Sequence, residues 1–148
     1  MPKYKKTARI SQWIARLFML ILMVSLFLMP RFVSWYAEKR ILTDTAQVVL
    51  LWAYYLCAVP AFWALLQIDN LLRNIGKDQV FLEKNCRIVT RIALCCAIVS
   101  LITLVSGFVY PPLLFIAVLM LFLGLLVYVV SNVLSAATAL REENDLTI

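Results

Sequence analysis

Residues Ile92–Ala139, IALCCAIVSLITLVSGFVYPPLLFIAVLMLFLGLLVYVVSNVLSAATA, form a long run that contains no Asp, Glu, Lys or Arg. A second uncharged run extends from Thr45 to Ile68. About 20 apolar residues are enough for a helix to cross the hydrocarbon core of a bilayer. Pro111 and Pro112 divide the longer stretch, because proline in a helix interior removes a backbone hydrogen bond. The two runs together predict three membrane-spanning helices.

The composition of the whole chain agrees with this interpretation. Apolar residues make up 64% of the 148 residues, and the mean hydropathy is +0.92. A soluble domain contains roughly 45–50% apolar residues. A water-soluble chain of this length has too small an interior to bury such an excess. The composition therefore excludes a water-soluble globular domain.

A further apolar run, Leu17–Met29, follows five basic residues near the N-terminus. This order resembles a secretory signal peptide, but the segment from Pro30 to Trp35 contains no small-x-small cleavage site. We therefore interpret the run as an uncleaved first span.

The sequence thus predicts an all-α polytopic membrane protein, a single domain of four transmembrane helices. The expected spans are residues 13–32, 46–66, 92–109 and 113–140, with a helical loop at 69–91 and a tail at 141–148. Pro30 and Pro60 fall within the first two spans, so we expect a bend or an end at each.

The basic residues predict the orientation. Four spans place both termini and the 69–91 loop on one side, which carries eleven of the 14 Lys and Arg residues. Five of these precede Leu17, five lie between Asp69 and Arg91, and Arg141 is the eleventh. Lys and Arg are enriched in cytoplasmic loops. We therefore expect a multi-pass protein of the cell membrane with both termini in the cytoplasm.

The same basic residues bear on partners. They lie in short clusters beside the spans, where each contributes about 1 kcal/mol of attraction to anionic lipid headgroups. We expect contacts with the bilayer and with anionic headgroups, and no direct binding of nucleic acid. Trp13 and Trp63 fall near the inner interface, whereas Trp35, Tyr36 and Tyr110 fall near the outer one.

Residues for catalysis or metal binding are scarce. The chain contains no His, which excludes His-based catalytic triads and His-ligated metal sites. Cys57, Cys95 and Cys96 fall inside spans, where cysteine behaves as a small apolar residue. We expect a non-enzymatic protein without a metal or cofactor.

Small and polar residues gather in the inner part of the last span, at Ser131, Asn132, Ser135 and Ala139. Three of them recur every four residues and form a smooth stripe, against which another helix backbone can approach closely. The partner of this stripe is either the third span, through Ala93 and Ala97, or a second copy of the chain in a homo-oligomer. The sequence leaves both alternatives open.

The 69–91 loop carries the most patterned polar residues. Helical spacing of apolar residues continues the second span as far as Gly76, a residue favoured at helix ends. A new helix is expected to begin near Glu83 and to lead into the third span. Lys84, Arg87 and Arg91 follow at three- and four-residue steps and therefore share one helix face. That face is either a solvated orientation signal or a binding surface.

The tail places three carboxylates, Glu142, Glu143 and Asp145, on the same side as this basic face. Opposite charges suggest that the tail docks against the loop, although exposed ion pairs contribute only about 0–1 kcal/mol each. A solvated, frayed terminus is the alternative.

Two segments resemble a known family. The tail LREENDLTI, residues 140–148, and the loop pattern LLRNIGK, residues 71–77, followed by Phe81, Asn85 and Arg87-Ile88, are similar to bacterial membrane proteins of domain of unknown function 2975. The likeness extends over essentially the whole chain in length and layout. It implies four spans and no established activity. Members resemble proteins encoded beside small helix-turn-helix regulators, which implies a cytoplasmic partner of that kind.

The leading hypothesis is therefore a non-enzymatic membrane protein whose loop and tail bind a cytoplasmic regulator. The candidate binding residues are Arg73, Phe81, Lys84, Asn85, Arg87, Glu142, Glu143, Asn144, Asp145 and Leu146. The alternative is a small transporter, channel or immunity-type protein that acts within the bilayer, with Asn132, Gln67 and Tyr128 as its polar candidates.

Overall fold

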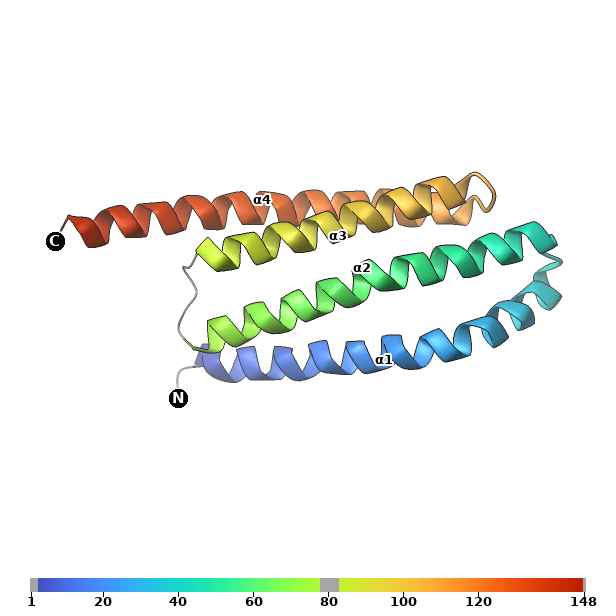
Figure 1. Ribbon diagram of the computed structural model, residues 1–148, viewed down its shortest axis with the longest axis horizontal. Coiled ribbons are helices and arrows are strands. Elements are labelled where there is room, and N and C mark those ends of the chain that lie inside the picture. Colours follow the sequence, from blue (N-terminus) through green and yellow to red (C-terminus); the bar gives the residue numbers. More distant parts are fainter. Residues whose placement is uncertain (1–2, 78–82, 148) are drawn as a thin grey trace.

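Four long helices form the chain (Figure 1). The computed structural model describes residues 3–77 and 83–147, with the backbone alone for residues 3–6, 8 and 145. The helices are α1 (Lys3–Arg40), α2 (Asp44–Gly76), α3 (Glu83–Gly107) and α4 (Pro112–Leu146), and the described residues include no strand. All four helices are long and apolar enough to cross a membrane. The all-α, four-span prediction is confirmed, and α2 ends and α3 begins at the expected residues.

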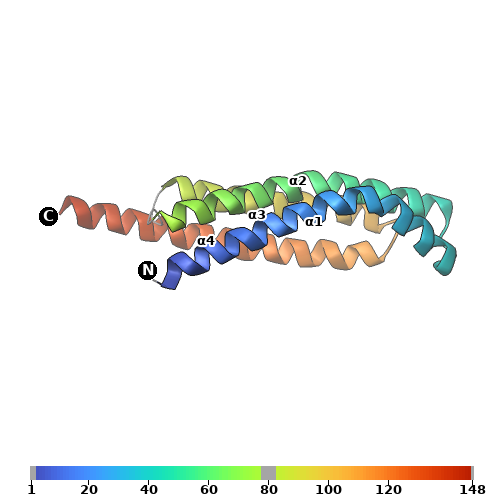
Figure 2. The same cartoon turned by 90° about the horizontal axis from the view of Figure 1, so that it is seen from below.

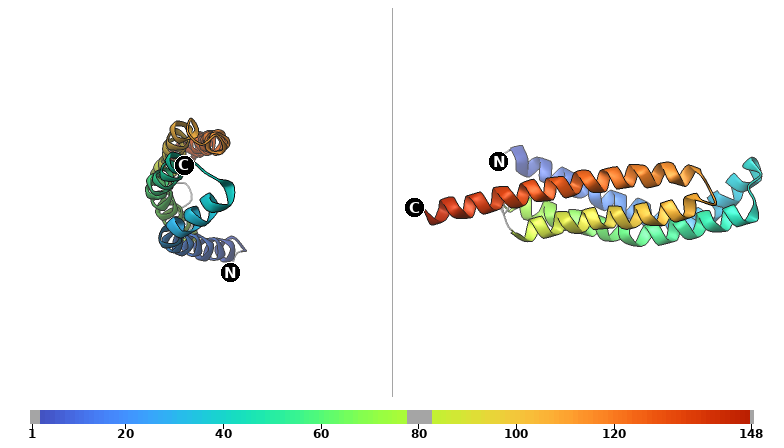
Figure 3. Two further views of the ribbon diagram at one scale, coloured as in Figure 1. Left: turned by 90° about the vertical axis from the view of Figure 1, so that its right-hand side faces the viewer. Right: turned by 90° about the horizontal axis from the view of Figure 1, so that it is seen from above.

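The helices lie side by side in the order of the sequence. α1 packs on α2, α2 on α3 and α3 on α4, whereas α1 and α4 make no contact within the described residues. Seen along its length, the molecule is a curved, open row rather than a closed bundle (Figure 3, left). The start of α1, the end of α2, the start of α3 and the end of α4 lie at one end of the row, which we call the terminal end (Figure 1). The other end, which we call the turn end, holds the α1–α2 and α3–α4 turns.

An open row leaves most large apolar side chains uncovered. Phe27 is 83% exposed and Phe115 is 76% exposed, and many other large apolar side chains of the spans are also exposed. A soluble protein rarely exposes contiguous apolar patches larger than a few hundred Å². This surface suits hydrocarbon, where the backbone groups are satisfied within each helix. The chain is therefore a multi-pass membrane protein.

The contact between α3 and α4 is built from small residues at a seven-residue spacing. The buried positions are Cys86, Ala93, Ser100 and Gly107 on α3, and Ala117, Gly124, Ser131 and Thr138 on α4. A seven-residue repeat keeps one face of each helix against its neighbour when two helices wrap around each other at a shallow angle. Small side chains along that face allow the two backbones to approach closely.

Hydrogen bonds follow this contact along its length. Ser100 Oγ donates to the carbonyl of Ala117 at 2.8 Å, and Ser131 Oγ donates to the carbonyl of Cys86 at 3.2 Å. Ser131 Oγ also lies 2.6 Å from Thr90 Oγ1. Hydroxyl groups that cross to the next helix are satisfied in hydrocarbon, where water is absent.

The four-residue stripe expected on the last span does not form this contact. Ser131 is buried in the contact with α3, but Ser135 and Ala139 are exposed. The shallow crossing places Thr138 rather than Ala139 against α3, because the repeat that stays in contact is seven residues long. The expected acceptor surface on α3 does receive α4, since Gly124 lies against the segment from Ala93 to Ala97.

Tyrosines connect α1 to α2. Pro30 lies inside α1, which continues to Arg40 and bends near its C-terminal end (Figure 2). Because proline has no amide hydrogen, the carbonyl of Leu26 loses its partner within the helix. The hydroxyl of Tyr55 on α2 donates to that carbonyl at 2.9 Å. One residue earlier on each helix, the hydroxyls of Ser25 and Tyr54 are hydrogen bonded to each other.

At the turn end, a hydrogen bond between two tyrosines joins α1 to the α3–α4 turn. Tyr36 Oη on α1 lies 3.1 Å from Tyr110 Oη in the α3–α4 turn. This hydrogen bond, with a smaller effect of desolvation, raises the pKa of Tyr110. The phenol therefore stays protonated at neutral pH and can donate to its partner.

Substitution of Gly124 tests the close approach of α3 and α4. A Cβ atom at Gly124 would lie 3.1 Å from Cys96 Cβ, whereas one at Gly76 would meet nothing within 4 Å. We expect Gly124→Leu to destabilise the protein by about 1–3 kcal/mol through overpacking. Gly76→Leu, the matched control, should be neutral or slightly stabilising because leucine favours helix. SDS titration followed by circular dichroism measures both; equal effects would contradict the packing described here.

The Tyr55 hydrogen bond predicts a double-mutant result. Tyr55→Phe should destabilise the protein by about 0.5–1 kcal/mol, because the Leu26 carbonyl is left without a donor in hydrocarbon. In a Pro30→Ala background the backbone amide of residue 30 can donate a hydrogen bond to the Leu26 carbonyl. The same Tyr55→Phe change should then cost clearly less, in the same SDS titration. Equal costs in both backgrounds would show that the hydroxyl does not serve this carbonyl.

Candidate functional site

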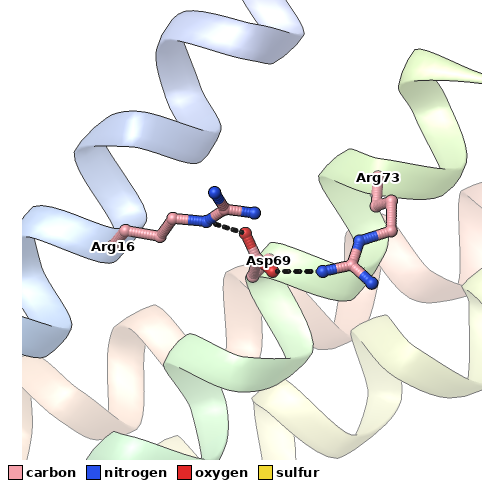
Figure 4. A network of polar contacts seen from close by, with 3 residues as sticks. All are labelled: Arg16, Asp69 and Arg73. Atoms are coloured by element: carbon pink, nitrogen blue, oxygen red, sulfur yellow. Dashed lines mark hydrogen bonds and ion pairs between the residues drawn. The ribbon is translucent and has the colours of Figure 1, made fainter.

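Most charged side chains of the helices lie at the terminal end, and a buried carboxylate there joins two helices (Figure 4). Asp69 on α2 is only 9% exposed. Its Oδ1 accepts a hydrogen bond from Arg16 Nε of α1 at 3.4 Å, and its Oδ2 accepts one from Arg73 Nη2 at 3.2 Å. The carboxylate thus joins α1 to α2 and holds Arg73 against the helix that bears it.

The Arg16–Asp69 pair was not predicted from the sequence, although a signal for it exists. Arg16 is the last charged residue before the uncharged run of α1, and Asp69 is the first after that of α2. Because the two helices are antiparallel neighbours, both charges lie at the same depth. Opposite charges at matching depth on adjacent helices are natural partners.

A pair of amides joins α2 to α3. Asn74 Nδ2 donates to Asn85 Oδ1 at 2.9 Å, and Asn85 is fully buried. Asn85 was expected at the partner-binding surface, but the structure places it inside the contact between two helices. Its side chain instead holds the first turn of α3 against the last turns of α2.

A polar groove runs along the contact between α2 and α3 at the terminal end. It encloses about 670 Å³ and is lined by Gln67, Asn70 and Arg73 of α2 and by Lys84, Arg87 and Arg91 of α3, among others. We call it the basic groove. The predicted residues Arg73, Lys84 and Arg87 therefore do come together.

A second recess, of about 430 Å³, lies on the other side of the α3 basic residues, against α4. Asn132 and Ser135 of α4 line it together with Arg87 and Arg91. Asn132 thus faces a polar recess on the surface of the row. The first turns of α3 form a basic ridge with a recess on each side.

The end of α4 projects beyond the other helices (Figure 1). Thr138 of α4 still contacts α3, with its Oγ1 3.8 Å from Cys86 Sγ. Every described side chain from residue 139 to residue 147 is exposed, and Leu146 is 87% exposed. We call residues 139–147 the α4 extension; the Asp145 side chain and Phe81 lie outside the described residues.

The α4 extension continues α4 as a helix to Leu146. Within the described residues, neither Glu142 nor Glu143 forms an ion pair with the basic residues of α3. The helix continues straight on because its Ala, Leu, Arg and Glu residues all favour helix. Candidate residues Glu142, Glu143, Asn144 and Leu146 are therefore presented to the surroundings of the protein.

The sequence profile of one family covers nearly all of the chain. The family described as "Protein of unknown function (DUF2975)" matches residues 6–148. The chain belongs to this family. No protein with a curated description and no solved structure shows significant similarity to the chain. The family assignment confirms the resemblance to this family, and it carries no activity.

The three polar candidates for an intramembrane pathway do not meet. Gln67 and Asn132 line separate recesses on the terminal half, and Tyr128 is 50% exposed on the outside of α4. The groove on the concave side of the row, about 350 Å³, is lined mainly by apolar side chains such as Leu50 and Val99. The described residues also include no cluster of three potential metal ligands among His, Cys, Asp and Glu.

Asp69→Asn tests the role of the buried carboxylate. We expect it to destabilise the protein by about 1–2 kcal/mol, a value reduced because both arginines are about half exposed. The matched control is Glu83→Gln, which removes an exposed pair with Arg87 within one helix and should change little. Thermal unfolding in detergent compares the two variants, and a Glu83→Gln effect as large as that of Asp69→Asn would contradict the assignment.

Proposed function

We propose that the chain is a non-enzymatic membrane protein that binds a soluble protein in the cytoplasm through the α4 extension. The adjacent basic ridge of α3 forms the second part of the surface. The observation that carries the proposal is the projection of a preformed, fully exposed helix end beyond the row. A preformed helix loses little conformational entropy on binding, so its contacts contribute more to affinity.

The chemistry of the α4 extension favours a partner with a basic surface. Glu142 and Glu143 offer two exposed carboxylates, and Leu146 offers an apolar side chain one turn further on. Complementary charge steers association and selects among partners. DNA-binding regulators carry such a basic surface. This agrees with the helix-turn-helix partner that the family resemblance implies.

The distribution of basic residues supports the cytoplasmic location. The terminal end carries eleven Lys and Arg residues, and the turn end carries Arg31, Lys39 and Arg40. By the positive-inside rule the terminal end faces the cytoplasm. A soluble cytoplasmic protein would then meet the α4 extension in water, clear of the lipid headgroups.

Site-specific photo-crosslinking in living cells tests the proposal. A photoreactive amino acid at position 143 should give one discrete crosslinked product with a soluble protein. The same amino acid at position 39, on the turn end, should not. Glu142→Gln should weaken the product formed from position 143, because it removes a charge that attracts the partner. Thr7→Gln, at the same end on α1, is the matched control and should have no effect.

Three crosslinking results would support or contradict the proposal. Loss of the product when the chain is truncated after Thr138 would support the α4 extension as the binding surface. A product from position 39 with the same protein would contradict the orientation. No product from any position on the terminal end would overturn the proposed function.

A further inference from the structure

The basic groove holds more positive charge than its own carboxylates neutralise. Arg73, Lys84, Arg87 and Arg91 line it, and Glu83 is the single carboxylate among the described residues that line it. Glu83 forms an ion pair with Arg87, with 2.7 Å between Oε1 and Nη2. Asp69, which does not line the groove, forms an ion pair with Arg73. Neither Lys84 nor Arg91 forms an ion pair or hydrogen bond with another described residue. The groove therefore attracts an anion, with two cationic groups available to contact it.

A buried amide in the groove lacks a partner. Gln67 is only 7% exposed, and its side chain makes no hydrogen bond with any other described residue. A buried polar group without a hydrogen bond costs roughly 1–3 kcal/mol. Among the described residues, no fully buried side-chain N or O atom lacks a hydrogen-bond partner. The unbonded amide of Gln67 is therefore accessible from the groove that it lines. It is placed to bond a molecule held there.

The groove lies at the depth of the lipid headgroups. Arg91 directly precedes the uncharged run that begins at Ile92, so it marks the edge of the hydrocarbon. Trp63, one turn from Gln67, lines the same groove and is 55% exposed. Trp is enriched at the interface between headgroups and acyl chains. One end of the groove is thus polar and cationic, and the other end is aromatic and apolar.

The groove opens on the lipid-facing, convex side of the row. On α2, the apolar concave groove is lined by positions such as Ala61, whereas the basic groove is lined by Trp63. Two residues at about 100° each place these positions on opposite sides of the helix. A lipid in the bilayer can therefore enter the basic groove sideways, without passing between α1 and α4.

We infer that the basic groove binds the phosphate of an anionic phospholipid. Arg91 and Lys84 contact the unesterified phosphate oxygens, and the Gln67 amide donates a hydrogen bond to the headgroup. The acyl chains continue beside Trp63 along α2 and α3. Basic pockets between transmembrane helices bind anionic headgroups in this way. The inference goes beyond the proposed protein partner and does not rest on it.

Native mass spectrometry of the purified full-length protein tests this inference. The delipidated protein is titrated with phosphatidylglycerol or with phosphatidylcholine of the same acyl chains. We expect phosphatidylglycerol to bind at least about tenfold more tightly. Inorganic phosphate, added at constant ionic strength, should not displace it, because free phosphate lacks the contacts along Trp63. Equal binding of the two lipids, or displacement by inorganic phosphate, would overturn the inference of a lipid site.

Variants locate the site. Arg91→Gln with Lys84→Gln should weaken phosphatidylglycerol binding about tenfold, because both available cations are lost. Arg9→Gln is the matched control: Arg9 is exposed on α1 at the same end but does not line the groove. Weakening by Arg9→Gln as large as that of the double variant would mean that only diffuse surface charge is acting, which contradicts the site.

Two milder variants remain informative if the double variant does not fold. Gln67→Leu keeps every charge and should still weaken phosphatidylglycerol binding by about threefold, because one hydrogen bond is lost. Arg91→Lys keeps the charge and should retain more binding than Arg91→Gln. Unchanged binding in Gln67→Leu and in Arg91→Gln, in protein with normal helix content, would overturn the inference.

Discussion

The exclusion of charge from hydrocarbon is the constraint on which the rest of this structure depends. An acidic or basic side chain at the centre of a transmembrane helix costs roughly 2.5–3.5 kcal/mol on insertion scales. The chain keeps residues 92–139 and 45–68 free of such side chains and gathers the charges at the helix ends. Asp69, the one well-buried carboxylate among the described side chains, is bonded by arginines on both sides, which reduces the cost of placing it near the apolar edge. Recognition chemistry is therefore confined to the ends of the row.

The same solvent changes what holds the helices together. Lipid tails are as apolar as leucine, so burial of apolar surface gives little force between helices inside the bilayer. Close approach of the helices and hydrogen bonds between them must supply this force. The α3–α4 contact uses small residues such as Gly124 and hydroxyl bonds such as Ser100 to Ala117. The α1–α2 contact uses Tyr55 to satisfy a carbonyl that Pro30 leaves free. The open row needs no central core, because its exposed apolar surface has lipid to face.

Features that depend on local sequence could be predicted, whereas those that depend on the crossing of helices could not. The end of α2 at Gly76 and the start of α3 at Glu83 follow from apolar spacing and from residues favoured at helix ends. Ser131 was recognised as a packing residue, but its partners at seven-residue spacing depend on the shallow crossing of α3 and α4. The burial of Asn85 likewise depends on how α3 is rotated against α2. For the tail, the sequence left docking against the loop and a frayed terminus open, and the structure continues α4 as a helix to Leu146, in line with the helix propensity of residues 139–146.

The two proposed binding surfaces of the terminal end share residues, so we expect occupancy of one to affect the other. Arg87 and Arg91 line both the basic groove and the recess beside α4. A phosphate that draws Arg91 toward α2 removes positive charge from the α4 side of the ridge, next to the acidic α4 extension. Two ligands that compete for the same side chains affect each other's affinity by the same factor. Because the groove opens toward lipid and the extension toward water, the basic ridge is the physical link by which the lipid around the protein could influence a partner bound at its end.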